Sequence, residues 1–220
     1  MEIDYVIKLG GSLLYDIEKT RLLLQRSKDS QFHNVYLIGS GYLGEVFKKW
    51  KNMNNILLSF QNSAKCWANI QSINACIING LDSDFLPCST IDEIYQIISE
   101  KKQPIIDTRD FYKYFSTSPN QKSNVRATLA CKMLQCKKLI IFTDVNGVYS
   151  EDPKNNIKAT KFKEIQAKEL ISMVRANLDE GFAENLINYG ITAYIIGINE
   201  FLSSSSFVDA LALESTIIHP

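Results

Sequence analysis

Residues 140–154 read IIFTDVNGVYSEDPK and combine a buried strand, a tight turn and a polar loop in one short stretch. The apolar run ends in Thr143 and Asp144, and the Asn-Gly pair that follows is typical of a turn. Such a turn can wrap a nucleotide, with Asp144 near the phosphate or metal end and the polar loop near the base. A plain hairpin with a capped loop is the alternative.

Four more apolar, β-branched runs occur along the chain, with amphipathic segments between them. Runs that are apolar on both faces and spaced by helices indicate a mostly parallel sheet covered on both sides, so the sequence predicts an α/β fold. The expected strands are 4–11, 34–39, 103–108, 137–144 and 192–197. The expected helices are 16–28, 42–52, 60–78, 91–100, 124–135, 166–175 and 182–189. We expect a hairpin or substrate-side loop at 111–123.

The composition restricts the kinds of partner that the chain attracts. The 24 basic residues balance the 24 acidic ones, so no global field favours nucleic acid or an anionic membrane, and any anion site must be local. The five cysteines lack CxxC spacing and are interpreted as reduced core thiols rather than metal ligands or disulfides. No uncharged run reaches the roughly 18 residues of a membrane span, so we expect a cytoplasmic protein.

The stretch VIKLGGSLL (6–14) places a lysine inside an expected buried strand, where an unpaired ammonium is costly. Gly10 and Gly11 follow, and the absence of Cβ lets their backbone N–H groups approach a bulky anion. A phosphate would satisfy both features. The alternative is a tight turn with Lys8 paired to a carboxylate.

A second expected strand runs into Gly39, Ser40 and Gly41 and then into a helix. Its N–H groups and the helix dipole would form a second anion cradle. Glycines that serve only the turn are the alternative here.

Together, KLGGS, GSG and TDVNGVYSEDPK resemble the amino acid kinase superfamily in motif order and over essentially the whole chain. Within it, AKCWANI, CKML and NLDEGFAENLINYGITAYIIG are most similar to the small kinases of methanofuran biosynthesis, which phosphorylate an aminomethylfuran methyl phosphate. The resemblance implies a three-layer αβα sandwich in one domain over 1–220, with an acceptor-binding half (1–125) and a nucleotide-binding half (126–220).

The same resemblance implies transfer of the γ-phosphoryl group of ATP, with Mg²⁺, to a phosphate-monoester or carboxylate acceptor. It also implies a homo-oligomer, with a hetero-oligomer left open. Lys8 would stabilise the phosphoryl group in flight, and Asn124 would stand beside it as the second catalytic residue. ATP would be bound by Gly10, Gly11, Ser12, Thr143, Asp144, Gly147, Val148, Tyr149, Pro153 and Lys154. The acceptor would be bound by Gly39, Ser40, Gly41 and Arg126.

The sequence departs from the family pattern at several positions, including Phe60 and the segment INEFLSSSSF after Gly197. Asn124 stands at a helix start that normally carries an aspartate organising the catalytic lysines, and an amide brings no negative charge. Ser40 replaces the middle glycine of a GGG loop, and Asn185 lies in the stretch where many members have a second lysine. Asn124 and Ser40 motivate the alternative of a degenerate family member that acts as a ligand-binding or partner subunit.

Other side chains were weighed for the same site. His33 and His219 are not expected to act as a base, and an acceptor that is already an oxyanion needs none. Arg126 could bind an acidic substrate or be solvated on the first helical turn. Lys132 could point inward toward phosphates or lie along the surface.

Overall fold

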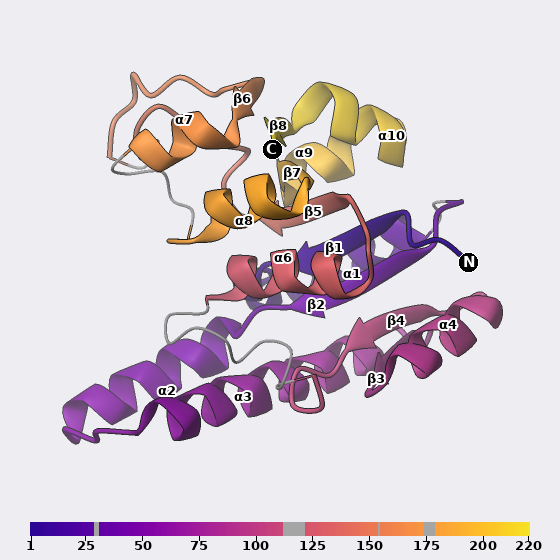
Figure 1. Ribbon diagram of the computed structural model, residues 1–220, viewed down its shortest axis with the longest axis vertical. Helices are drawn as coiled ribbons and strands as arrows, with labels where there is room; N and C mark the ends of the chain where they lie inside the picture. Colours follow the sequence, from indigo (N-terminus) through magenta and orange to yellow (C-terminus); the bar gives the residue numbers. More distant parts are fainter. Residues whose placement is uncertain (29–30, 112–121, 154, 174–178) are drawn as a thin grey trace.

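The computed structural model describes residues 1–28, 31–111, 122–153, 155–173 and 179–220 (Figure 1). Its strands are β1 (Tyr5–Leu9), β2 (Asn34–Ile38), β3 (Phe85–Cys88), β4 (Gln103–Ile106), β5 (Lys138–Thr143), β6 (Glu164–Gln166), β7 (Thr192–Gly197) and β8 (Thr216–His219).

Its α-helices are α1 (Ile17–Lys28), α2 (Gly41–Met53), α3 (Phe60–Leu81), α4 (Ile91–Ser99), α6 (Ser123–Met133), α7 (Ala167–Ser172), α8 (Phe182–Tyr189), α9 (Ile198–Ser203) and α10 (Phe207–Asp209). A 3₁₀ turn, η1 (Gly11–Tyr15), follows β1, and a π-helical turn, η2 (Ala210–Glu214), precedes β8.

One eight-stranded sheet runs through the molecule in the order β3-β4-β2-β1-β5-β7-β8-β6. All neighbouring strands are parallel except β7 and β8. The strands of the first chain half therefore lie on one side of the β1–β5 junction, and those of the second half lie on the other. The carboxyl ends of β1 and β5 meet at this junction, the position where open α/β sheets gather ligands.

Two apolar cores cover the two faces of the sheet, because successive strand side chains point to opposite sides. Val6 belongs to the core under α4, α6, α7 and α8, whereas Ile7 belongs to the core under α1, α3, α9 and α10. Figure 1 shows α6 and α8 side by side over the centre of the sheet. The predicted αβα sandwich with a mostly parallel sheet is confirmed.

The five expected strands are all present, with ends shifted by a few residues. Three strands were missed because their sequences carry weak signals. β3 contains Pro87 and lies at the sheet edge, where a missing N–H is tolerated. β6 and β8 have only three and four residues, too few to show a period. The expected loop at 111–123 falls almost wholly outside the described residues.

The prediction that all five cysteines are core thiols is right for three of them. Cys88, Cys131 and Cys136 are buried, whereas Cys66 is partly exposed and Cys76 is exposed. Both exceptions lie on α3, which turns part of its circumference to solvent. No disulfide joins any of the five, and none of the helices described is long and apolar enough to span a membrane.

Candidate active site

Lys8 lies in the centre of the sheet, on β1 between β2 and β5. Its side chain is only 8% exposed, and among the described residues it has no hydrogen bond or ion pair. Burial lowers its pKa to about 8, because desolvation disfavours the charged form; Asp179 and Asp144 oppose this effect through their negative charge. The alternative of a direct Lys8–carboxylate pair is therefore wrong within the described chain.

A cavity of about 330 Å³ opens beside Lys8 at the carboxyl end of β5. Eight residues predicted from the sequence line it: Lys8, Asn124, Thr143, Asp144, Gly147, Val148, Tyr149 and Pro153. The structure thus brings together two predicted segments that are more than a hundred residues apart in the chain. Lys154, the remaining residue predicted in the nucleotide loop, lies outside the described residues.

Five further lining residues were not predicted: Ile141, Val145, Glu151, Asp152 and Ile195. The strand register explains two of them. Lys8 pairs with Ile141, and Ile141 pairs with Ile195, so these three side chains form a row on one face of the sheet. The alternation of each strand would have pointed to Ile141 and Ile195 once the strand order was known.

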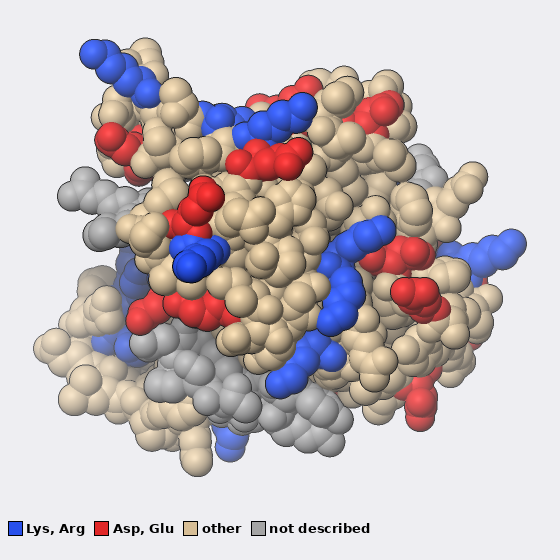
Figure 2. Space-filling model, turned by 45° about the horizontal axis from the view of Figure 1, so that its top comes forward, with Lys and Arg blue, Asp and Glu red and all other residues tan. Residues whose placement is uncertain are grey.

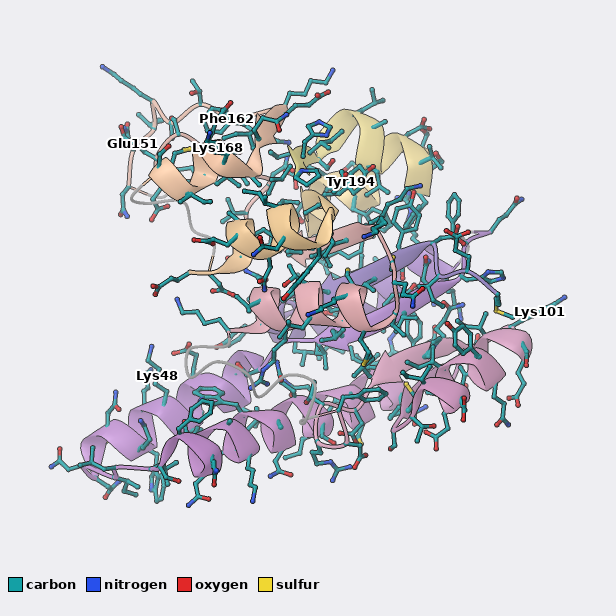
Figure 3. The ribbon with its side chains drawn as sticks, viewed as in Figure 1. Lys48, Lys101, Glu151, Phe162, Lys168 and Tyr194 are labelled. Carbon is teal, nitrogen blue, oxygen red and sulfur yellow. The ribbon has the colours of Figure 1, made fainter. Side chains whose placement is uncertain are left out.

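The carboxylates of Glu151 and Asp152 belong to the polar loop, and Figure 3 shows Glu151 on the segment that leads from β5 to β6, at the outer edge of the molecule. Acidic and basic side chains lie in small mixed groups on the face shown in Figure 2. The charges in the cavity are therefore local, as the balanced composition predicts.

The predicted turn at the start of this loop is confirmed, and β7 and β8 hold it in place. Gly147 has φ +92°, and a Cβ there would lie 2.4 Å from Thr216 Oγ1. The next amide, of Val148, donates to that same hydroxyl at 3.0 Å. Asn146 Oδ1 accepts a hydrogen bond from the amide of Gly197 at 3.3 Å. Glycine at 147 is needed both for the backbone conformation and for this close contact.

The two glycine motifs meet at a second place, which we call the glycine corner: residues 10–12 and 39–41. A Cβ on Gly11 would lie 2.0 Å from the backbone nitrogen of Gly41, so the two loops pack backbone against backbone. The amide of Gly10 donates to Phe142 O, and that of Gly39 donates to Leu9 O, each at 2.9 Å. These two N–H groups are occupied, so the expectation that they bind an anion is wrong.

Other donors at the corner remain available. In the part of the chain that is described, the amides of Gly11, Ser12 and Gly41 have no acceptor, because they open η1 and α2. Ser40, which replaces the middle glycine of the GGG loop, points toward α2: a Cβ on Gly44 would lie 2.5 Å from its Oγ. The Ser40 side chain therefore packs against the first turn of α2. The corner residues do not line the 330 Å³ cavity.

The first turn of α6 carries two predicted residues in different roles. Asn124 lines the cavity, and its Oδ1 is buried without a partner among the described residues. Arg126 is 5% exposed and donates to Gln71 Oε1, so it is neither solvated nor part of the cavity wall. The interpretation of Arg126 as a solvated arginine is therefore wrong, whereas its binding of an acidic substrate stays a prediction.

The remaining candidates lie away from the cavity. Lys132 is exposed, with Nζ 4.7 Å from the ring centre of Tyr189, so its inward-pointing interpretation is wrong. His33 Nδ1 lies 3.2 Å from Glu2 O, and His219 Nε2 lies 3.1 Å from Glu164 Oε2. Neither histidine lines the cavity. The described residues contain no group of three or more His, Cys, Asp or Glu side chains that could hold a metal ion.

Comparison with known proteins gives one consistent result. The sequence profile of the amino acid kinase family matches residues 5–205. The uridylate kinases of Pyrococcus abyssi and Thermococcus kodakarensis are each 26% identical to this chain, over 87% of its length and 89% of theirs.

Solved structures show the same fold. The UMP kinase of Ureaplasma parvum superposes with a TM-score of 0.76 at 15% identity and covers 100% of both chains. The uridylate kinase of Archaeoglobus fulgidus gives a TM-score of 0.73 at 19% identity, covering 98% of this chain and 100% of its own.

Proposed function

The chain belongs to the amino acid kinase family, and from this premise we propose that it transfers the γ-phosphoryl group of ATP to a phosphate-monoester oxygen. We propose UMP as the first acceptor to test, because the curated relatives are uridylate kinases that match most of the chain. We propose aminomethylfuran methyl phosphate as the second, on the resemblance of three sequence stretches to the small kinases of methanofuran biosynthesis.

The observation that carries this proposal is the position of Lys8. A buried amine without a partner among the described residues, at the wall of a polar cavity, is costly unless an anion joins it there. A phosphoryl group in transfer carries its charge on equatorial oxygens, and catalysis consists mainly of positioning and neutralising that charge. Lys8 has the charge and the location for this role.

The neighbouring residues fit the two ends of such a reaction. The loop from Thr143 to Pro153 offers backbone and side-chain contacts to a nucleotide beside Lys8. The amides of Gly11, Ser12 and Gly41 offer donors to an anion from the other side of β1. We propose the nucleotide at the loop and the acceptor phosphate near the glycine corner.

No general base is needed for this chemistry. Both histidines lie away from the cavity, and a phosphate-monoester oxygen is already an anion at neutral pH. Magnesium would add charge neutralisation on the nucleotide phosphates. Since the described residues hold no three-ligand cluster, the phosphates and water would supply most of its ligands, as is common for Mg²⁺.

The test is a transfer assay with [γ-³²P]ATP and Mg²⁺. The acceptors, offered one at a time, are UMP, aminomethylfuran methyl phosphate and the carboxylate N-acetylglutamate. We expect labelled UDP, and we expect Lys8→Met to lower kcat/KM by about a hundredfold or more. Lys132→Met is the matched control, because it makes the same chemical change at an exposed lysine and should leave kcat/KM unchanged.

The outcomes separate the alternatives. Transfer to aminomethylfuran methyl phosphate but not to UMP would show that UMP is the wrong acceptor, while the proposed kinase activity would stand. Nucleotide binding without transfer to any acceptor would favour the degenerate, ligand-binding alternative. Equal losses in Lys8→Met and Lys132→Met would remove Lys8 from the mechanism. Homo-oligomer formation stays a prediction, for which sedimentation velocity is the direct measurement.

A further inference from the structure

Lys8 is a buried cation, yet the residue at the helix start that faces it carries no negative charge. The helix start that faces Lys8 carries the neutral Asn124, whose Oδ1 has no partner among the described residues. A buried ammonium needs a nearby negative charge to stay protonated at low cost. Among the described residues, the charged groups on the elements around Lys8 include Asp144, Glu151 and Asp152 on the cavity loop, Lys122 and Arg126 at the start of α6, and Asp179 before α8.

Asp179 differs from the cavity-loop carboxylates in burial and in its contacts. Its side chain is 14% exposed, whereas Asp144 and Glu151 are exposed. Its Oδ2 accepts a hydrogen bond from the backbone amide of Asn124 at 3.0 Å. Its Oδ1 lies 3.7 Å from Lys122 Nζ. Asp179 therefore brings a fixed negative charge to the N-terminal end of α6, where the helix dipole favours it.

The segment that holds Asp179 is itself fixed against α6. The carbonyl of Asp179 accepts from the amide of Phe182 at 3.0 Å as α8 begins. One turn further along α6, Thr128 Oγ1 accepts from Asn185 Nδ2 at 2.8 Å. Among the described residues, Asp179 and Asn185 thus each form a hydrogen bond to α6, and of these two bonds the one from Asp179 involves a charge.

We propose that Asp179 is a positioning residue that supplies, from the start of α8, the negative charge which holds the Lys8 ammonium and the first turn of α6 in their working arrangement. The inference deepens the proposed function and rests on it. The carboxylate absent at position 124 is thereby replaced by one from a different element, and Asn124 contributes its backbone amide to the same arrangement.

A purely structural Asp179 would need only an oxygen to accept the Asn124 amide, and an asparagine could provide it. A positioning Asp179 acts through its charge. The variant Asp179→Asn separates the two roles, because it keeps an acceptor oxygen and removes the charge.

The experiment follows the titration of Lys8 by NMR in protein labelled with ¹³Cε-lysine, without nucleotide or acceptor. The Lys8 signal is the one absent from Lys8→Met. We expect the Lys8 midpoint, near pH 8 in the unaltered protein, to fall by about one pH unit in Asp179→Asn. Glu180→Gln is the matched control, since it makes the same change at the adjacent exposed residue and should leave the midpoint in place.

A second variant keeps the proposal testable if Asp179→Asn does not fold. Asp179→Ser also keeps an oxygen that can accept the Asn124 amide and removes the charge, so it should lower the Lys8 midpoint in the same direction. A Lys8 midpoint that stays in place in the Asp179 variants, or that responds equally to Asp179→Asn and Glu180→Gln, would overturn the proposal. Because no substrate is present, these outcomes are independent of whether UMP is the acceptor.

Discussion

The glycine corner and the cavity beside Lys8 both carry motifs that sequence patterns associate with phosphate, yet they are built in different ways. At the corner, Gly11 and Gly41 bring two backbones together so closely that no side chain fits between them. In the cavity, side chains from β1, α6 and the loop after β5 surround an open space. Glycines can mark a close packing contact of the chain with itself as well as a place for a ligand.

The two regions also differ in how they contribute to the free energy of folding. The corner is stabilised by its own backbone hydrogen bonds, such as those from Gly10 and Gly39. In the part of the chain that the structure describes, Lys8 has no direct partner in the cavity, so the unliganded protein bears a desolvation cost there. Substitutions at the glycine corner should therefore mainly lower the free energy of unfolding. Substitutions at the cavity should mainly change the rate of phosphoryl transfer.

The largest expected effect is at the corner. Gly11→Ala places a Cβ 2.0 Å from a backbone nitrogen, which cannot move aside as a flexible side chain can. We expect the free energy of unfolding to fall by on the order of 4 kcal/mol, or folding to fail. Gly80→Ala is the control: nothing lies within 4 Å of its Cβ position, so it should stabilise α3 by about 0.5–1 kcal/mol. Urea denaturation measures both, and similar values for the two variants would contradict the close-packed corner.

The second largest effect is expected for Lys8→Met in the cavity, which should raise the free energy of unfolding rather than lower it. A folded-state pKa near 8, against an ordinary 10.5, means that the unfolded chain binds the proton more tightly. The resulting cost is fully present below pH 8 and fades as pH rises toward the ordinary value, about 3 kcal/mol in all. Lys8→Met should therefore raise the free energy of unfolding at pH 7 by about 2–3 kcal/mol, while abolishing transfer.

Urea denaturation of both proteins at pH 7 and pH 10 tests this, because the other titrating groups cancel in the difference. The gap between Lys8→Met and the unaltered protein should narrow at the higher pH. If the difference in the free energy of unfolding were the same at both pH values, or if Lys8→Met were less stable than the unaltered protein, burial of the Lys8 amine would not destabilise the fold.

The pH dependence of catalysis should follow the same group. Because protonated Lys8 is the form that neutralises phosphate, kcat/KM should fall tenfold per pH unit above about pH 8. Lys8→Arg should remove this alkaline decline, since guanidinium stays charged. A decline that persists in Lys8→Arg would assign it to another group.

The smallest expected effect is that of restoring a carboxylate at the start of α6. With Asp179 already supplying charge, Asn124→Asp should change kcat/KM by about threefold or less. In the Asp179→Asn background, the same substitution should recover much of the lost rate, as double-mutant coupling requires. A large gain from Asn124→Asp alone would instead indicate a decayed site.

The cavity was predictable in its parts because each part has a local signal. The Asn146–Gly147 turn, the strand that carries Lys8 and the helix that begins near Asn124 all follow from short-range patterns, and the structure places them together. Asp179 was not predicted, because an aspartate before a helix is an ordinary sequence feature until the fold shows which amide it contacts.

Local sequence patterns were enough to predict the α/β class, five of the strands and the turn after β5, since periodicity and turn chemistry act over a few residues. Tertiary structure alone decided that Arg126 is buried against Gln71, and that Gly11 and Gly41 touch. It also decided that the Asp179 carboxylate accepts the backbone amide of Asn124. These facts depend on contacts between residues 30 to 55 positions apart, which strand order and helix packing fix and no local pattern records.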